Sequence, residues 1–257
     1  MDAELTANPA LAETTAAAIG AHQEVLARAI VDRVYRNPFW DARYGAAGRA
    51  RSFDDSVHNL DQLAAVLRLG LPAEVGYYYR WLRDVLVLRG MTTRHMLDCL
   101  ETMRAVLADG LPAAEAALAG NWLRVGEAAL VYDHPFAQAV YAAAEPITAG
   151  AVERLAERAR AADRDSSASA TREQQDLGYH LSYLTDALVL GRPDLFTAYA
   201  TWVTGFLVQV GASAAGLRAG LLALEAEIAA HVPPFAGEVH ALIAAGVAAV
   251  DQATAGA

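Results

Sequence analysis

The chain has 257 residues, of which 55% are apolar, and its formal net charge is −10. Its 20 basic residues are all arginine, and 30 acidic residues outnumber them. This composition excludes a disordered chain. It also argues against binding to nucleic acid or to an anionic membrane, because both are driven by the neutralisation of phosphate charge. Cys99 is the single cysteine, so an internal disulfide framework is excluded.

The N-terminal sequence MDAELTANPALAE is acidic and lacks the basic and apolar regions of a signal peptide. The most apolar long window, near residues 205–224, contains Arg218, so we expect no membrane-spanning helix. These features predict a soluble, cytoplasmic protein, and a lone free cysteine fits a reducing compartment.

Helical periodicity and regular stop signals predict an all-α fold. Much of the apolar content is alanine, a strong helix former. Three glycines stand where left-handed helix ends are expected, and each is followed by a proline or threonine that starts a helix: Gly70, Gly90 and Gly110, then Pro72, Thr92 and Pro112. The predicted helices are 10–36, 52–69, 73–89, 92–108 and 112–131, then 135–161, 171–190, 193–210, 213–230 and 234–252. Residues 39–51 are expected to form an Arg/Gly-rich loop, and residues 163–170 a mobile polar one.

The second half of the chain repeats signals of the first. The stretch from Pro193 to Trp202 has the spacing of Pro72 to Trp81, and Gly211 and Ser213 match Gly90 and Thr92. These coincidences predict an internal duplication of about 120 residues. We expect two tandem helical bundles, over residues 1–131 and 132–257, for which a globin-like arrangement is one option.

Two acid–histidine pairs have the i, i+4 spacing that sets both side chains on one helix face: Asp54 with His58, and Asp176 with His180. A carboxylate beside an imidazole fixes its tautomer and raises its basicity, which suits a ligand to a bound group or a proton-transfer role. The alternative is a surface pair of small energetic value.

Aromatic side chains follow on the next helix of each half. Tyr78 and Trp81 in the first half correspond to Tyr199 and Trp202 in the second, each pair at i, i+3. Such aromatics either belong to the core or form the walls around a flat ligand beside the histidine.

Three arginines of the expected loop, Arg43, Arg49 and Arg51, have no counterpart in the second half. Guanidinium groups before a helix suit carboxylate or phosphate recognition, or they pair with Asp41, Asp54 and Asp55. Glu-x-x-His, HExxH, phosphate-loop and dinucleotide patterns are absent, and we predict no metal site. Cys99, four residues after His95, is expected to be a buried structural cysteine.

The run Arg43 to Leu63 and its echo Asp176 to Leu188 resemble a helical bacterial module with the pattern RYG-x-x-GR, an acid, then His-Leu-x-x-Leu. Such modules occur in regulatory or photosensory chains, some beside cobalamin-binding domains. The chain has no Asp-x-His-x-x-Gly cobalamin motif. The resemblance therefore implies a duplicated sensory or ligand-binding module.

The leading hypothesis is a non-enzymatic sensor or binding protein that holds a small flat ligand, such as a haem or bilin tetrapyrrole, near His58/Tyr78/Trp81 or His180/Tyr199/Trp202. Arg43, Arg49 and Arg51 would then meet acidic substituents of the ligand. One alternative is an enzyme that uses the Asp–His pairs as general acid/base or metal ligands. Another is a protein–protein adaptor. Homo-oligomerisation and a regulatory protein partner both stay open.

Overall fold

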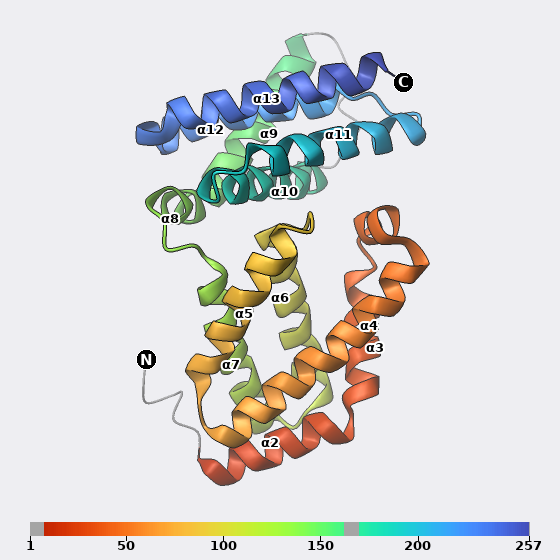
Figure 1. The fold of residues 1–257 in the computed structure, drawn as a ribbon, viewed down its shortest axis with the longest axis vertical. Coiled ribbons are helices and arrows are strands. Elements are labelled where there is room, and N and C mark those ends of the chain that lie inside the picture. Colours follow the sequence, from red (N-terminus) through yellow and green to blue (C-terminus); the bar gives the residue numbers. More distant parts are fainter. Residues whose placement is uncertain (1–7, 162–169, 257) are drawn as a thin grey trace. The chain divides into compact units, whose positions relative to one another are not determined.

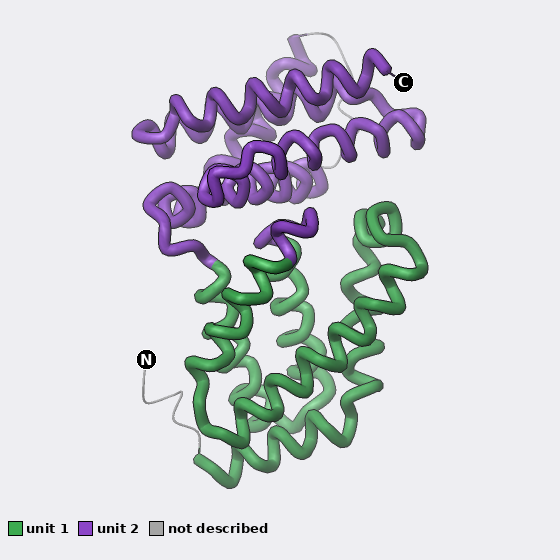
Figure 2. Tube along the Cα trace, viewed as in Figure 1, with its two compact units in different colours: residues 1–85, 95–130 green, residues 86–94, 131–257 purple. Residues whose placement is uncertain are grey.

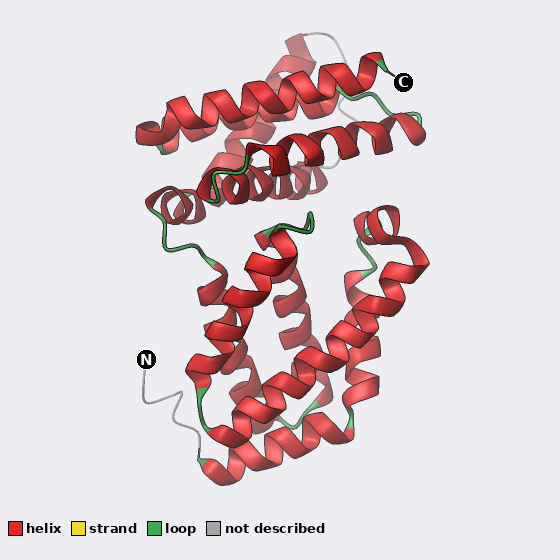
Figure 3. Ribbon diagram, in the orientation of Figure 1, coloured by secondary structure: helices red, strands yellow, loops and turns green. Residues whose placement is uncertain are grey.

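The structure is a computed structural model that describes residues 8–161 and 170–256 (Figure 1). All elements in these residues are helical, twelve α-helices and one 3-10 turn, which confirms the predicted all-α class (Figure 3). The expected polar loop falls mostly on residues 163–169, which lie outside the described residues.

The chain divides into two compact units (Figure 2). Unit 1 comprises residues 1–85 and 95–130, and unit 2 comprises residues 86–94 and 131–257. The division is therefore not the single cut expected between residues 131 and 132. The short segment 86–94, which both parts of unit 1 flank in sequence, belongs to unit 2.

In unit 1, α4 (Pro38–Leu69) packs against α2 (Pro9–Ala21) and α3 (Gln23–Val34). α2 also packs against α7 (Ala113–Leu130). α5 (Pro72–Val87) and α6 (Thr93–Gly110) complete the helices of the first half, and their adjoining ends lie in the segment 86–94. The largest fully buried side chains of this core include Ile19, Leu60, Leu67, Leu100, Leu107 and Trp122.

Two expectations for the first 70 residues are wrong. The predicted helix 10–36 is broken at His22, which separates α2 from α3. The predicted loop 39–51 is helical, because Asn37 caps the start of α4 by accepting a hydrogen bond from the Phe39 amide (3.0 Å). Gly45 alone absorbs the change of direction inside α4, with φ 61° and ψ −163°, a conformation that favours glycine. The three arginines of the expected loop therefore lie on a kinked helix.

Unit 2 contains α8 (Pro135–Ala142), α9 (Ala144–Ala161), α10 (Ala170–Val189), α11 (Pro193–Gln209), α12 (Ala215–His231) and α13 (Ala236–Ala255), with a 3-10 turn at Pro233–Phe235. α13 packs on α11 and α12, and α9 packs on α12 and α10. The predicted helix 135–161 is broken at Ala143, which ends α8.

Among the described helices, the stretch 233–255 is long and apolar enough to cross a membrane by length and composition, with a mean hydropathy of 1.3 over its best window. This stretch had not been expected to qualify. The core helix of a soluble protein passes the same test. α13 does bury one face in unit 2, through Val239, Leu242, Ile243 and Val250.

Backbone features recur in the two halves at a constant separation of 121 residues. The helix-ending glycines Gly70 (φ 68°) and Gly90 (φ 87°) are matched by Gly191 (φ 62°) and Gly211 (φ 71°). Gly110, also expected to end a helix in this way, is instead the last residue of α6 and has no positive φ. Main-chain hydrogen bonds also recur at the same separation, among them Leu71 N to Val66 O with Arg192 N to Ala187 O, Met91 N to Leu86 O with Ala212 N to Leu207 O, and Leu26 N to His22 O with Ile147 N to Ala143 O.

Candidate functional site

In unit 1, three of the predicted site residues form a chain of rings between α4 and α5. The His58 and Tyr78 ring centroids are 6.2 Å apart, and those of Tyr78 and Trp81 are 6.1 Å apart. His58 is exposed, Tyr78 is half-buried, and Trp81 is 59% exposed. The structure thus brings these side chains together, with the histidine and tryptophan open to solvent.

The Tyr78 hydroxyl donates a hydrogen bond to Asn59 Oδ1 (2.7 Å), a residue that sequence reasoning missed. Burial, and secondarily the charge of Asp55, raises the pKa of Tyr78 to about 12, so its phenol stays protonated. Burial also raises the pKa of Asp55, an effect opposed by the charge of Arg51. Asp55, next to the predicted Asp54, is therefore the carboxylate that acts on the tyrosine.

In unit 2, the corresponding histidine and tyrosine rings pack against other side chains of the unit. His180 Nδ1 and the Tyr199 hydroxyl share a hydrogen bond of 2.7 Å. The Tyr199 ring stacks on Tyr183 with centroids 3.6 Å apart and planes inclined by 12°. Burial lowers the pKa of His180 to about 4, so its imidazole is neutral at pH 7.

The remaining predicted residues of unit 2 have separate surroundings. Trp202 stacks on Phe206 at 5.9 Å. Burial raises the pKa of Asp176, and the charge of Arg172 opposes the rise. Trp202 is therefore not part of the run of ring contacts from His180 through Tyr199 to Tyr183.

The tyrosine hydrogen bonds correct the pairing of the two histidines. Tyr78 bonds to the residue 19 positions before it, Asn59, and Tyr199 bonds to the residue 19 positions before it, His180. Asn59 and His180 are 121 residues apart, like the glycines and the backbone bonds, whereas His58 and His180 are 122 apart. His58 is therefore one residue out of register, about 100° around the helix, from the counterpart of His180.

The three predicted arginines of α4 interact with side chains between residues 32 and 55. Arg49 donates to Asp32 (2.8 Å) and lies over the Tyr35 ring, 5.0 Å from its centroid. Arg43 hydrogen bonds to Tyr44, and the charge of Arg51 acts on Asp55. The partner of Arg49 is thus Asp32 of α3, which is not among the expected partners Asp41, Asp54 and Asp55.

A small hollow lies between α4 and α5, beside the Tyr78 hydroxyl. Its cavity volume is about 10 Å³, space for roughly one water molecule. Its lining is mostly apolar, with polar groups from two side chains of α4: Asn59, Gln62, Leu63, Val66, Val75, Tyr78 and Tyr79. Pockets that enclose drug-sized ligands have about 300–1,000 Å³, so this hollow is too small to enclose a tetrapyrrole.

Across the described ranges 8–161 and 170–256, no group of three or more His, Cys, Asp or Glu side chains is arranged to hold a metal ion. Cys99 lies in α6, and burial raises the pKa of its thiol to about 12. The side chain is partly buried, where a fully buried cysteine was expected.

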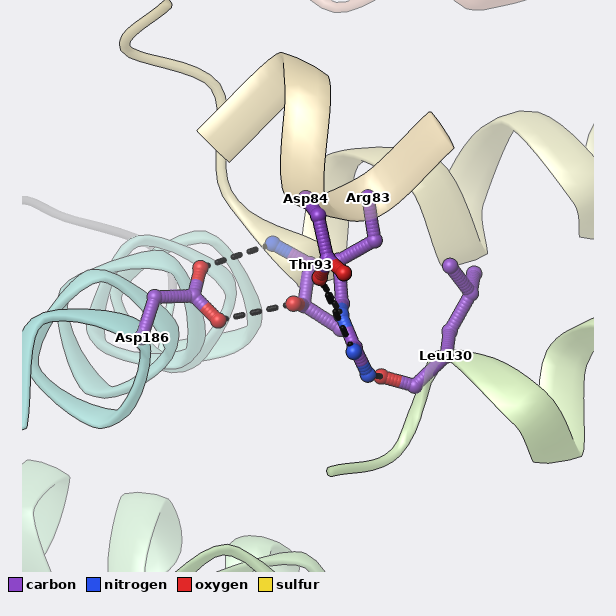
Figure 4. A network of polar contacts seen from close by, with 5 residues as sticks. All are labelled: Arg83, Asp84, Thr93, Leu130 and Asp186. Atoms are coloured by element: carbon purple, nitrogen blue, oxygen red, sulfur yellow. Dashed lines mark hydrogen bonds and ion pairs between the residues drawn. The ribbon is translucent and has the colours of Figure 1, made fainter. Parts of the chain in front are cut away.

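A second polar cluster, which the sequence did not predict, lies in unit 2. The buried Asp186 carboxylate accepts hydrogen bonds from the Thr92 hydroxyl (2.5 Å), the Thr93 amide (2.9 Å) and the Thr93 hydroxyl (2.7 Å). Figure 4 shows the carboxylate directed at Thr93, and it also draws the contacts of Arg83 with Asp84 and the Leu130 carbonyl. Burial raises the pKa of Asp186, and these hydrogen bonds oppose the rise. Asp186 thus caps the start of α6 and holds the segment 86–94 in unit 2.

Comparison with known proteins found no family model, no curated protein and no solved structure that matches this chain.

Proposed function

We propose that this chain is a non-enzymatic ligand-binding or regulatory protein built from two copies of one helical unit, with its ligand site on unit 1. The observation that carries the proposal is the open ring surface formed by His58, Tyr78 and Trp81. Trp81 is 59% exposed and stands 6.1 Å from Tyr78. Burying a large aromatic side chain is strongly favourable, so an exposed one beside two further rings suits a flat partner.

The proposed duplication is supported by features that recur 121 residues apart. Left-handed glycines, helix-end hydrogen bonds and the tyrosine bonds on Asn59 and His180 all share this separation. Two independently evolved bundles have no physical reason to repeat so many helix-end features at one constant separation.

Divergence between the copies favours unit 1 as the site. In unit 2, Tyr199 is only 5% exposed and its face is covered by Tyr183. In unit 1, the equivalent Tyr78 is half-buried and faces the exposed His58. The first copy has kept an accessible ring surface, and the second has filled it with its own side chains.

A tetrapyrrole is the ligand class that we propose for this surface. It would lie on the open rings of Trp81 and Tyr78, since the neighbouring hollow cannot enclose it. The exposed imidazole of His58 would coordinate the iron of a haem or hydrogen bond to a bilin.

Absorption titration with haem and with a bilin tests this proposal. We expect a saturable shift of the main absorption band that His58→Ala and Trp81→Ala weaken at least tenfold, which corresponds to a loss of about 1.4 kcal/mol. His240→Ala is the control, because His240 is an exposed histidine of α13 that bonds to Glu225. A spectrum that does not change with either ligand, or that changes equally in all three variants, contradicts the proposal.

A protein partner is a second candidate function, favoured by exposed apolar residues at the turn between α4 and α5. Leu69 is 67% exposed, Leu71 49% and Tyr77 57%. A surface of this kind is typical of protein contacts. Light scattering tests self-association: complexes of the wild type that are absent from a Leu69→Ser/Leu71→Ser variant support it, and a monomer at all concentrations removes a second copy as the partner.

A further inference from the structure

The segment 86–94 is held on one face of α10. Three side chains of that face, at i, i+1 and i+4, hydrogen bond to the turn and to the first residues of α6: Ser182, Tyr183 and Asp186. Ser182 Oγ lies 2.7 Å from the Thr92 hydroxyl and accepts a hydrogen bond from the Arg94 amide (3.0 Å). Thr92 is 0% exposed, so the polar face of α10 shields this turn from solvent.

The matching turn of the second half, residues 207–215, is open to solvent. At the separation of 121 residues, Ser213 corresponds to Thr92, yet Ser213 is exposed. Val208 is 40% exposed, whereas its counterpart Val87 is 2% exposed. In the part of the chain that the structure describes, this free turn thus lacks the helix face that shields its counterpart.

The matching helix face, on α4, is also open to solvent. It is a stripe of exposed residues at i, i+4 and i+8: Asp61, Ala65 and Leu69. Leu69 is 67% exposed. The counterparts on α10 are less accessible, because Asp186 is 2% exposed and Ser182 and Leu190 are half-buried. Each copy of the chain therefore presents both the free turn and the α4 stripe to solvent.

We propose that these two surfaces bind each other between copies of the chain, so that the free turn of one copy docks on the α4 stripe of the next. The contact repeats the one that segment 86–94 makes with α10. The inference rests on the proposed duplication and on self-association, the second candidate function, and it names both surfaces of the contact. Because the two surfaces differ, the contact is heterologous and continues from copy to copy.

The polar groups of the two surfaces complement each other. Asp61 holds the position of Ser182, so its carboxylate is suited to accept hydrogen bonds from the Ser213 hydroxyl and the Ala215 amide, the counterparts of the groups that Ser182 meets. α12 begins at the free turn and has no acidic residue in its first turn. A carboxylate from another copy is therefore favourable at this helix start.

The position that has lost its hydrogen bond has lost both partners together. On α10, Asp186 meets Thr93, and the corresponding residues are Ala65 on α4 and Ala214 in the free turn. A carboxylate or hydroxyl buried against alanine would lose its partner at a cost in free energy. Two alanine side chains can pack there without that cost.

Sedimentation velocity of the whole protein tests the proposal. We expect the wild type to associate with a dissociation constant on the order of 100 µM, as suits a small contact. Ser213→Asp keeps a cap for the Ala215 amide but sets a carboxylate against Asp61 of the next copy. Ala65→Glu sets a charge into the alanine contact. Each variant should associate at least tenfold more weakly, and a wild type that stays monomeric at about 1 mM overturns the proposal.

A mixture of the two variants tests the order of the contact. Ser213→Asp keeps an intact α4 stripe, and Ala65→Glu keeps an intact free turn, so an equimolar mixture should form 1:1 dimers. These dimers should grow no further, because the two surfaces left open are both blocked by carboxylates. A mixture that stays monomeric overturns the proposal, and so does a Ser213→Asp variant that associates as strongly as the wild type.

Val25→Glu is the matched control for an added charge. Val25 is 70% exposed on α3 and belongs to neither surface, so this variant should associate like the wild type. Circular dichroism checks that each variant folds. If one does not, Val208→Glu replaces Ser213→Asp, or Leu69→Ser replaces Ala65→Glu.

The same measurements separate this inference from the proposed function. The variants leave His58, Tyr78 and Trp81 in place, so titrations of the monomer with haem or a bilin should be unchanged in them. Association that the mixture does not restore overturns only the head-to-tail contact and leaves self-association standing. A monomeric wild type overturns both, and neither result bears on the tetrapyrrole.

Discussion

His180 Nδ1 lies 2.7 Å from the hydroxyl of Tyr199, and in unit 1 the same bond is made by Asn59 and Tyr78 at the same distance. The two helix pairs therefore keep one tyrosine hydrogen bond while exchanging an amide for an imidazole. Only the imidazole can change its charge near neutral pH. This difference makes one of the two bonds sensitive to acid.

We predict that acid destabilises unit 2 through His180. The folded pKa of about 4 lies below the 6.5 of a free imidazole, so the unfolded chain binds the proton first as the pH falls. The contribution of the neutral ring is complete above about pH 6.5 and is lost between pH 6.5 and 4, by up to about 3 kcal/mol. Urea unfolding at several pH values measures this loss.

The matched variant is His180→Asn, which reproduces the amide of Asn59. The Oδ1 of the new asparagine can accept a hydrogen bond from the Tyr199 hydroxyl, as Asn59 Oδ1 does from Tyr78. Most of the stability at pH 7 should therefore remain. The fall in stability between pH 6.5 and 4 should become smaller than in the wild type. An identical pH dependence in both proteins would show that His180 is not the group responsible.

Removal of the Asp186 carboxylate should be strongly destabilising. Asp186→Ala leaves the Thr93 amide and hydroxyl buried without their acceptor, whereas the Thr92 hydroxyl keeps Ser182 Oγ (2.7 Å). Each buried donor left without a partner costs about 1–3 kcal/mol. Asp186→Asn, which keeps the shape, should lie between Ala and the wild type. Thermal unfolding measures the order, with exposed Asp61→Ala expected within about 0.5 kcal/mol of the wild type.

Cys99 should be unreactive in the folded protein. Its pKa is raised to about 12, chiefly by burial, so at pH 8 its thiolate fraction is on the order of a thousandfold below that of a free cysteine. Because Cys99 is the single cysteine, modification by a thiol reagent reads out one site. We expect very slow labelling in buffer and fast labelling in denaturing urea. Equal rates under both conditions would show that the thiol is accessible.

The kink in α4 depends on Gly45. Gly45→Ala should cost about 1–3 kcal/mol, because its φ of 61° and ψ of −163° favour glycine. Gly178 lies within α10 with no atom near the position of a new Cβ, so Gly178→Ala should instead stabilise by roughly 0.5–1 kcal/mol. Circular dichroism and urea unfolding of both variants measure the difference in sign. A Gly45→Ala variant as stable as Gly178→Ala would contradict this account.

Local signals predicted much of the fold from sequence. Gly70 and Gly90 end helices in the left-handed conformation, and Pro72 and Pro193 begin them, as their residue types indicate. The kinked helix was missed because an Arg/Gly-rich stretch before a serine also reads as a loop and cap. The conformation of Gly45 determines whether this stretch is a kinked helix or a loop, and the residues around Gly45 do not predict its φ.

The candidate site was predicted only in part, for two physical reasons. His58 and His180 were paired because they are the same residue type. A shift of one residue along a helix, however, moves a side chain by about 100° around the helix axis. Asn59 and Gln62 were overlooked because neither carries charge. The Asp186 contacts join residues more than 90 positions apart in the chain, and no local pattern encodes such a partner.

The placement of residues 86–94 in unit 2 has a consequence for the newborn chain. Thr93 leaves the ribosome 93 residues ahead of Asp186, which at about 5–20 residues per second is a delay of roughly 5 to 20 seconds. During that interval the Asp186 carboxylate, which later accepts hydrogen bonds from the Thr93 amide and hydroxyl, has not yet been made. The first unit is thus synthesised in full while the start of α6 still lacks its cap, and that cap is completed only once α10 has emerged.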